Sequence, residues 1–402
     1  MSSPAPLTIV EAPVSQWDRG RHMAGKPFAG LIDALLVEAP VLYEFGGSIL
    51  REDAEAAWIW AIRDVCPDLM PSDAAERGVV ASDIEPVLPE MLTRMREALG
   101  RIKDDHEARR RLVAQLGDED KIDRLPVVIN ALRARSLLGK AQALGKAANN
   151  FGDEAALATT LETMPLQDGA LVAFLFHAMI GEVTNPTKFT SAALMLAGNA
   201  REETILRSGY GPLVDAMLAH AQNQLHRLQP SGAFVDIDLT CSAIERFHRL
   251  VRALTGYIEF GRNSRWALVL SAITKQVSEH VEPRLNELVP DIHQGLRRPR
   301  EGVDRLDDDR LLAALNGMYL LATVRDCRES LALNASFDMA WSQSGEALDM
   351  HFARNLDLLR QNPDDAIVNK RLDMAIKLSE LRFNAEYALT LQRARAAIEK
   401  RG

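Results

Sequence analysis

Apolar residues recur every three or four positions along most of this chain, a spacing that places them on one face of an α-helix. The stripe after Pro363 predicts a helix of several turns, and its members are Val368, Leu372, Ala375, Ser379, Phe383, Tyr387 and Leu391. The same period marks segments 213–229, 242–260, 266–288 and 306–333. Strand-like alternation is nearly absent, and Leu7–Val10 is the only good strand candidate. The sequence therefore predicts an all-α protein, an irregular multi-helix bundle or loosely solenoidal helical stack, with long helices in its C-terminal half.

Several helix starts are marked by side chains that accept hydrogen bonds from the unpaired backbone amides of a first turn. Asn185 and Asn362 each precede a proline, whose fixed φ suits the first helical position. Asp153 and Ser336 stand in front of two further apolar-periodic segments. We therefore expect these four residues to be helix N-caps.

Proline is concentrated near the N-terminus, where nine of the 18 prolines fall within the first 90 residues. Residues 1–27 contain four prolines and no helical period, which predicts an extended arm. Turn residues near Gly117 and at 229–232 mark further boundaries. The expected organisation is the arm (1–27), an N-terminal helical region (28–120), a central helical region (121–230) and a C-terminal bundle of long helices (231–402).

Composition and charge restrict the class of protein. Of the 402 residues, 47% are apolar and 26% charged, which excludes a disordered chain. The formal net charge of −9 disfavours nucleic acid as a partner. No run of 18 uncharged apolar residues occurs, so no membrane insertion is expected. The first residues lack the pattern of a signal peptide, and the three cysteines (Cys66, Cys241 and Cys327) are expected to stay unpaired, so we expect a soluble, cytoplasmic protein.

Two stretches form the strongest candidate for a cationic surface. Residues 125–152 contain no acid, and residues 94–111 hold seven basic against four acidic side chains. The candidate interaction residues of the first stretch are Arg133, Arg135, Lys140 and Lys146. A charge run usually marks a solvated helix face, and binding of an anionic partner is the alternative. Between Gln294 and Arg310, in contrast, five arginines meet five acids, which predicts a charged surface loop rather than a nucleic-acid site.

Residue patterns that carry catalysis are few. Glu245 and His248 form a Glu-x-x-His motif, but a di-iron bundle needs two such motifs on facing helices. His177 lies in an apolar helix, where a core histidine bonded to a carbonyl is favoured over a haem ligand. Gly139 and Gly145 are separated by five residues instead of the four of a phosphate-binding loop, so they are expected to permit close helix packing. We therefore predict no metal and no cofactor.

Trp17 stands in the proline-rich arm, where no helix is expected to bury it. An aromatic anchor in an extended segment can dock into the groove of a partner. In the favoured alternative, the arm folds back and Trp17 covers the first helix pair.

These observations favour a helical protein–protein interaction protein without catalytic activity, which means an adaptor, a regulator or a scaffold. A protein partner would meet Trp17 or the basic residues of segment 125–152, and a homo-oligomer is compatible with the pattern. The alternative is an all-α enzyme or ligand binder with a site in the bundle core, for which Glu245, His248 and His177 are the candidate residues.

Overall fold

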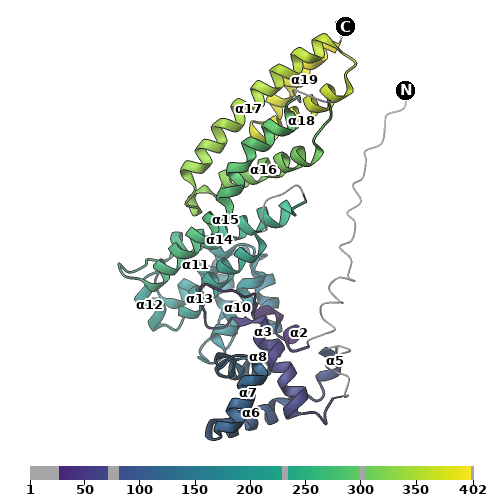
Figure 1. The fold of residues 1–402 in the computed structure, drawn as a ribbon. Coiled ribbons are helices and arrows are strands. Elements are labelled where there is room, and N and C mark those ends of the chain that lie inside the picture. The colour runs from purple at the N-terminus through teal and green to yellow at the C-terminus, as the bar shows by residue number, and fades with distance from the viewer. Residues whose placement is uncertain (1–26, 71–80, 229–233, 299–303, 400–402) are drawn as a thin grey trace, which may run out of the picture. The chain divides into compact units, whose positions relative to one another are not determined.

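A computed structural model describes residues 27–70, 81–228, 234–298 and 304–399 (Figure 1). Helices account for most of these residues, which confirms the all-α prediction. Their one sheet pairs two short parallel strands, β1 (Leu36–Val37) and β2 (Ile49–Leu50). No helix within the described ranges combines the length and the apolar character needed to cross a membrane. Leu7–Val10 and the predicted arm up to residue 26 lie outside the described residues.

The chain divides into two units, and each is described by itself. The first unit comprises the residues up to Pro40, 47–145 and 170–182, and the second comprises 41–46, 146–169 and 183–402. At the boundary predicted near Gly117, helix α7 (His106–Leu116) ends at this glycine, whose φ is 81°. The turn predicted at 229–232 lies outside the described residues.

The first unit is built on helices whose apolar faces share one core. Its elements are α2 (Pro27–Leu31), η1 (Asp33–Leu35), α3 (Arg51–Trp60), η2 (Ala61–Val65), α5 (Ala81–Ile84), α6 (Leu88–Asp104), α7 (His106–Leu116), most of α8 (Asp120–Ala148) and α10 (Val172–Glu182). In the core, Phe28 meets Trp58 edge-on with ring centroids 5.2 Å apart. A Cβ on Gly145 would lie 2.4 Å from the carbonyl oxygen of Met179, so this glycine lets α8 approach α10 closely. The packing role predicted for Gly145 is thereby confirmed, whereas the same prediction for Gly139 was wrong, because a Cβ there would meet no atom within 4 Å.

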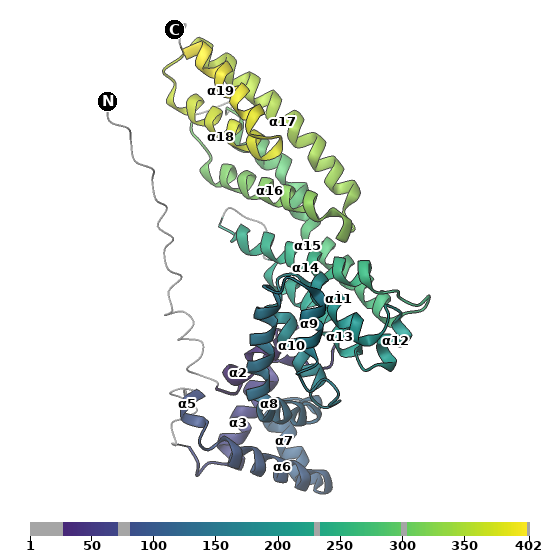
Figure 2. The same cartoon turned by 180° about the vertical axis from the view of Figure 1, so that it is seen from behind.

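The second unit contains the long helices expected in the C-terminal half. Its elements are α9 (Glu154–Leu161), α11 (Pro186–Ala197), α12 (Glu202–Arg207), α13 (Gly211–Gln222), η3 (Asn223–Arg227), α14 (Ile237–Tyr257), α15 (Arg265–Leu296), α16 (Asp308–Cys327), η4 (Arg328–Ser330), α17 (Asn334–Gln361), α18 (Ala366–Arg382) and α19 (Ala385–Glu399). Helix α15 packs against α16 and α17, and α18 packs against both α17 and α19 (Figure 2). Each of these long helices therefore buries apolar residues against at least one neighbour.

Two of the four predicted N-caps are confirmed. The Asn185 side chain accepts a hydrogen bond from the Lys188 amide at 3.4 Å, and that of Asp153 accepts one from the Ala155 amide at 3.1 Å. The prediction for Asn362 was wrong: the chain makes a turn after Pro363 before the helix begins.

The cap of α18 is Asp365, which accepts from the amides of Ile367 and Val368 at 3.0 Å each. The prediction for Ser336 was also wrong, because α17 begins earlier, at Asn334. The Ser336 hydroxyl donates instead to the Glu282 carboxylate.

The apolar stripe predicted as one helix after Pro363 is shared by two helices. Helix α18 ends at Arg382, and Asn384 accepts from the Tyr387 amide at 2.8 Å to start α19. The apolar pattern does not reveal this break, because Phe383 continues the apolar spacing across it.

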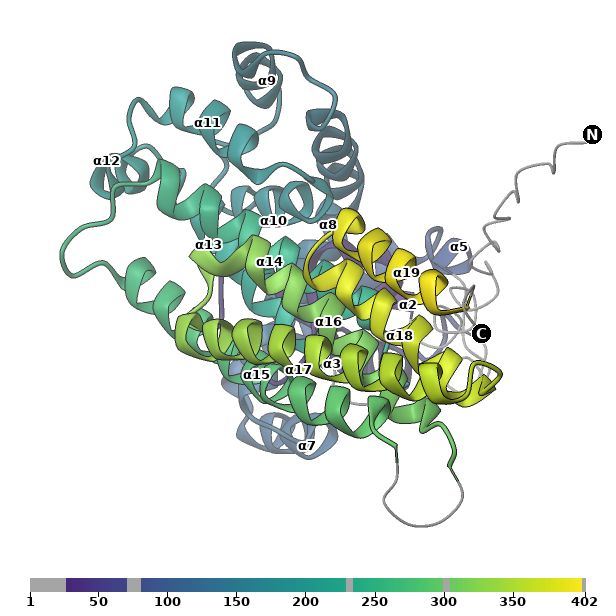
Figure 3. The same cartoon turned by 90° about the horizontal axis from the view of Figure 1, so that it is seen from above.

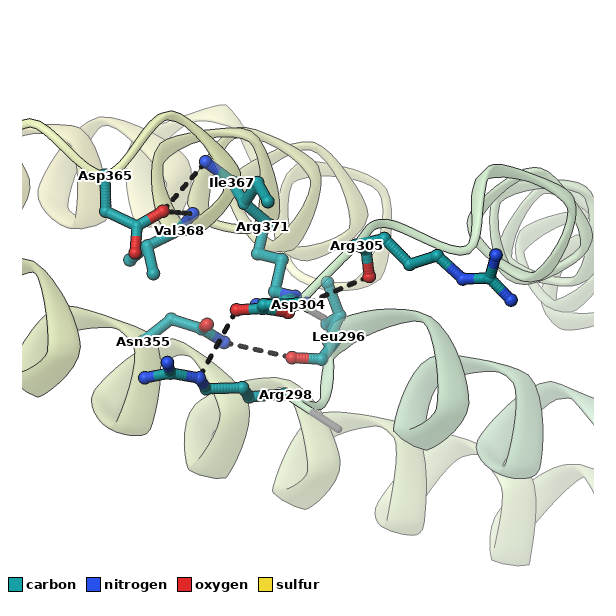
Figure 4. Close-up of polar contacts among 9 residues, drawn as sticks. All are labelled: Leu296, Arg298, Asp304, Arg305, Asn355, Asp365, Ile367, Val368 and Arg371. Atoms are coloured by element: carbon teal, nitrogen blue, oxygen red, sulfur yellow. Dashed lines mark hydrogen bonds and ion pairs between the residues drawn. The ribbon is translucent and has the colours of Figure 1, made fainter. Parts of the chain in front are cut away.

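The connection between α15 and α16 is anchored from inside the bundle (Figure 4). Arg371 of α18 is 0% exposed, and its two terminal nitrogens donate to the two carboxylate oxygens of Asp304. One of these nitrogens also donates to the Arg305 carbonyl at 3.2 Å. Asn355 of α17 donates to the Leu296 carbonyl at 3.2 Å. The loop predicted as a charged surface segment thus also supplies the counter-ion of a buried arginine.

Candidate functional site

The basic residues of segment 125–152 follow the solvent side of α8. Arg133 and Lys140, seven positions apart, are exposed, and Arg135 is half-buried. Lys146 is exposed as well, and it is counted with the second unit. The four residues therefore do not form one patch within a single unit.

A surface hollow of about 290 Å³ lies between α6 and α8 in the first unit. Three arginines line it, Arg96 from α6 and Arg133 and Arg135 from α8, and we call it the arginine hollow. Its remaining lining residues, all from α6, are Pro89, Leu92 and Thr93. Arg133 and Arg135, two of the predicted interaction residues, thus share the hollow with an arginine from another helix.

The arginine hollow carries more positive than negative charge. Arg135 lies 3.9 Å from the Glu85 carboxylate, and its side chain also donates to the Leu132 carbonyl at 3.4 Å. Arg96 and Arg133 are exposed and form no ion pair with any residue that the structure describes. Both guanidinium groups therefore have all their side-chain donors available to an anion.

The other predicted basic stretch, 94–111, is partly neutralised by nearby acids. Its ion pairs join Arg94 to Asp68 at 2.7 Å and to Glu90 at 2.8 Å, Arg109 to Glu119 at 3.0 Å, and Arg111 to Glu107 at 3.4 Å. Of this stretch, only Arg96 lines the hollow.

Helix α16 packs against both α14 and α15 in the second unit (Figure 3). A second candidate site, a cavity of about 480 Å³, is lined by residues of α15, of α16 and of the beginning of α14. Helix α15 contributes one face to it, because Arg284, Glu287, Leu288 and Asp291 follow the helical period. Helix α16 contributes a second face, with Arg310, Ala313, Asn316, Gly317 and Leu320. We call this space the Arg284 cavity. Gly317 brings the two helices together, since a Cβ there would lie 3.0 Å from a terminal carbon of Leu288.

Two charged side chains of the Arg284 cavity, Asp291 and Arg284, differ in their hydrogen-bond partners. Asp291 is 7% exposed and accepts a hydrogen bond from Arg310 at 2.7 Å. Burial raises the pKa of Asp291, and Arg310 opposes that rise. Arg284 is 8% exposed, and its one polar partner among the described residues is the Thr240 hydroxyl at 3.3 Å. Burial accordingly lowers the pKa of Arg284.

The residues named for the enzymatic alternative, His177, Glu245 and His248, have the surroundings of structural side chains. His177 lies in α10 of the first unit and is 1% exposed, as a core histidine would be. In the second unit Glu245 lies 3.8 Å from Arg249, and the Nδ1 atom of His248 lies 2.9 Å from the Ser330 hydroxyl. Burial lowers the pKa of His248. Within the described ranges, no group of three or more His, Cys, Asp or Glu side chains is placed to hold a metal ion.

The cysteines are not placed for nucleophilic chemistry. Cys66, Cys241 and Cys327 form no disulfide, and burial raises the pKa of each thiol, that of Cys327 to about 12. A reactive cysteine needs the opposite shift, because the thiolate is the nucleophile. Trp17 lies outside the described residues, so its docking role stays a prediction.

Sequence reasoning missed Arg284, Asp291 and Arg310, although a signal was present. Within the apolar stripe of segment 266–288, Arg284 occupies the position between Val281 and Leu288 at which a core residue is expected. An arginine at such a position either reaches solvent or is buried with a polar partner, and the helical period alone does not distinguish the two.

Comparison of the chain with models of protein families, with curated proteins and with solved structures gives no match.

Proposed function

We propose that this protein is a helical interaction protein that binds an acidic segment of a protein partner in the arginine hollow. The observation that supports this function is the pair Arg96 and Arg133, two exposed arginines from different helices that line one hollow without a carboxylate partner in the described chain. The planar guanidinium group matches a carboxylate with two parallel hydrogen bonds, so this hollow suits glutamate or aspartate side chains.

The shape of the hollow favours an acidic peptide over nucleic acid. A nucleic-acid surface follows the phosphate backbone with a row of basic groups over many ångströms. Here the arginines gather at a hollow of about 290 Å³, and the ion pairs of Arg109 and Arg111 remove their charges from any row. The net charge of −9 adds a general repulsion toward polyphosphates.

Each exposed charge pair is worth only about 0.2–1 kcal/mol. Removing Arg96 and Arg133 together is therefore expected to cost about 1 kcal/mol, or about fivefold in affinity. A weak, salt-sensitive contact of this kind is typical of an adaptor that reads a short charged segment, with further contacts supplied by the rest of the partner.

The test uses the full chain and a fluorescein-labelled peptide of alternating glutamate and alanine, followed by fluorescence anisotropy at low salt. The double variant Arg96→Gln/Arg133→Gln should weaken peptide binding about fivefold. The matched control is Arg110→Gln/Arg111→Gln, which removes the same charge from exposed positions of α7 in the same unit and should bind as the unchanged protein does.

Equal loss in both double variants would show that only net charge matters and would overturn the proposal. So would tighter binding of a single-stranded DNA of the same length, if that binding also depended on Arg96 and Arg133.

A further inference from the structure

Arg284 is a buried cation whose counter-ion is missing from the described chain. Its side chain has five N–H donors, and one of them reaches the Thr240 hydroxyl at 3.3 Å. Glu287, three positions further along α15, opposes the lowering of the Arg284 pKa, but no ion pair joins these two side chains in the described chain. Because a buried charge without a partner is unfavourable, and Arg284 is only 8% exposed, a bound anion would stabilise this position.

The walls around Arg284 suit a hydrocarbon. Leu288 of α15 and Leu320 of α16 line the cavity from two sides, and Val235 and Ile237, beside the start of α14, line it from a third. Its volume of about 480 Å³ lies within the range of small-molecule pockets, about 300–1,000 Å³. These apolar side chains form one part of the wall, and charged side chains line the rest of the cavity.

The remaining charges restrict how many negative groups a ligand carries. Asp291 and Arg310 neutralise each other at 2.7 Å. Glu287, Asp307 and Asp309 are exposed and also line the cavity, so they repel a ligand that carries a second negative charge. A single anionic group on an apolar body pairs with Arg284 and meets less repulsion than a dianion does.

From this arrangement we infer that the Arg284 cavity binds a small amphipathic monocarboxylate, a function that goes beyond the interaction proposed above. The carboxylate takes two hydrogen bonds from the guanidinium group of Arg284, and the hydrocarbon part lies against Leu288 and Leu320. Because Arg284 is only 8% exposed, water screens this pairing less than it screens a pair on the open surface.

The test measures binding of decanoate to the full chain by isothermal titration calorimetry at neutral pH. Saturable binding of one decanoate is expected, with decylammonium and the dianion sebacate at least about tenfold weaker. Arg284→Met should weaken decanoate binding about tenfold or more and leave the melting temperature equal or higher, because it removes an unpaired buried charge while keeping the length of the side chain.

Two further variants separate this site from general hydrophobic binding. Ala313→Leu fills part of the cavity and should weaken decanoate binding with Arg284 in place. Arg252→Met removes an arginine of α14 that pairs with Glu329 at 2.8 Å outside the cavity, and it should leave binding unchanged. The inference is overturned if decanoate does not saturate, if decylammonium binds as tightly, or if Arg284→Met binds as the unchanged protein does.

Discussion

Replacement of Asp304 by asparagine tests the ion pair that holds the α15–α16 connection in the bundle. Asparagine keeps the shape of the side chain but removes its charge and turns one acceptor oxygen into a donor. Arg371 is 0% exposed, so it would be left buried with one amide oxygen and the Arg305 carbonyl, at 3.2 Å, as acceptors, and without a counter-charge. The variant therefore converts a paired buried charge into an unpaired one.

The size of the effect follows from burial on the two sides of the pair. Removing one partner of a buried ion pair lowers the free energy of unfolding by about 3–5 kcal/mol. The Asp304 side chain is 17% exposed, which favours the lower end, about 3 kcal/mol. Arg298, half-exposed and 3.4 Å from the same carboxylate, adds less than about 1 kcal/mol. In a unit of this size, a loss of about 3 kcal/mol lowers the melting temperature by about 6–12 °C.

The measurement is thermal and urea unfolding of the full chain, followed by circular dichroism. Arg371→Met is the matched variant, and it should cost less than Asp304→Asn, because the remaining carboxylate reaches water and keeps Arg298. The double variant Asp304→Leu/Arg371→Met should recover most of the stability, since a well-packed apolar pair replaces the buried ions. A loss below about 1 kcal/mol for Asp304→Asn, or a larger loss for Arg371→Met, would refute this reasoning.

Two further predictions concern a buried histidine and a helix crossing. Burial lowers the pKa of His351 to about 4, with His293 and Arg354 acting in the same direction. Its contribution to stability is thus complete above the ordinary pKa of 6.5 and is lost as the pH falls toward 4, by up to about 3 kcal/mol. The slope of urea-unfolding free energy between pH 7 and pH 5 should flatten in His351→Gln, and an unchanged slope would contradict the shift. Gly145→Ala should lower the free energy of unfolding by about 1–3 kcal/mol, because the added Cβ meets the Met179 carbonyl. Gly139→Ala has open space around its Cβ and should raise the free energy of unfolding by about 0.5–1 kcal/mol. Equal melting temperatures for the two variants would show that α8 and α10 do not approach closely.

The fold class was predictable because a helix imposes its period on the sequence wherever one face is buried. Asp153 and Asn185 could be recognised as caps because a cap bonds within a few residues of itself. The choice between Asn362 and Asp365 could not be made in this way. Both side chains are suitable acceptors, and the turn that follows Pro363 decides which of them meets the first helical amides.

The candidate sites were predictable only as far as their chemistry is local. An acid-free run of 28 residues, 125–152, located Arg133 and Arg135. Part of the charge of the second basic stretch is neutralised by Asp68, which lies 26 residues from its partner Arg94 in the sequence. The same limit hid the buried arginines: Arg371 finds its carboxylate 67 residues away, at Asp304. An arginine inside an apolar stripe can be noticed in a sequence, but its partner is a property of the fold.

Both proposed sites bind a carboxylate through arginine, but the arginines differ in their exposure to water. Salt dependence can therefore distinguish the two sites. Arg96 and Arg133 lie in water, where charges are screened over about 8 Å at physiological salt, so binding of the acidic peptide should weaken steeply as salt is added. Arg284 is only 8% exposed, so salt screens its charge less, and decanoate should still bind at a salt concentration that removes the peptide. An equally steep salt dependence for both ligands would place the decanoate carboxylate on a surface charge, and would thereby remove Arg284 as its partner while leaving the arginine hollow unaffected.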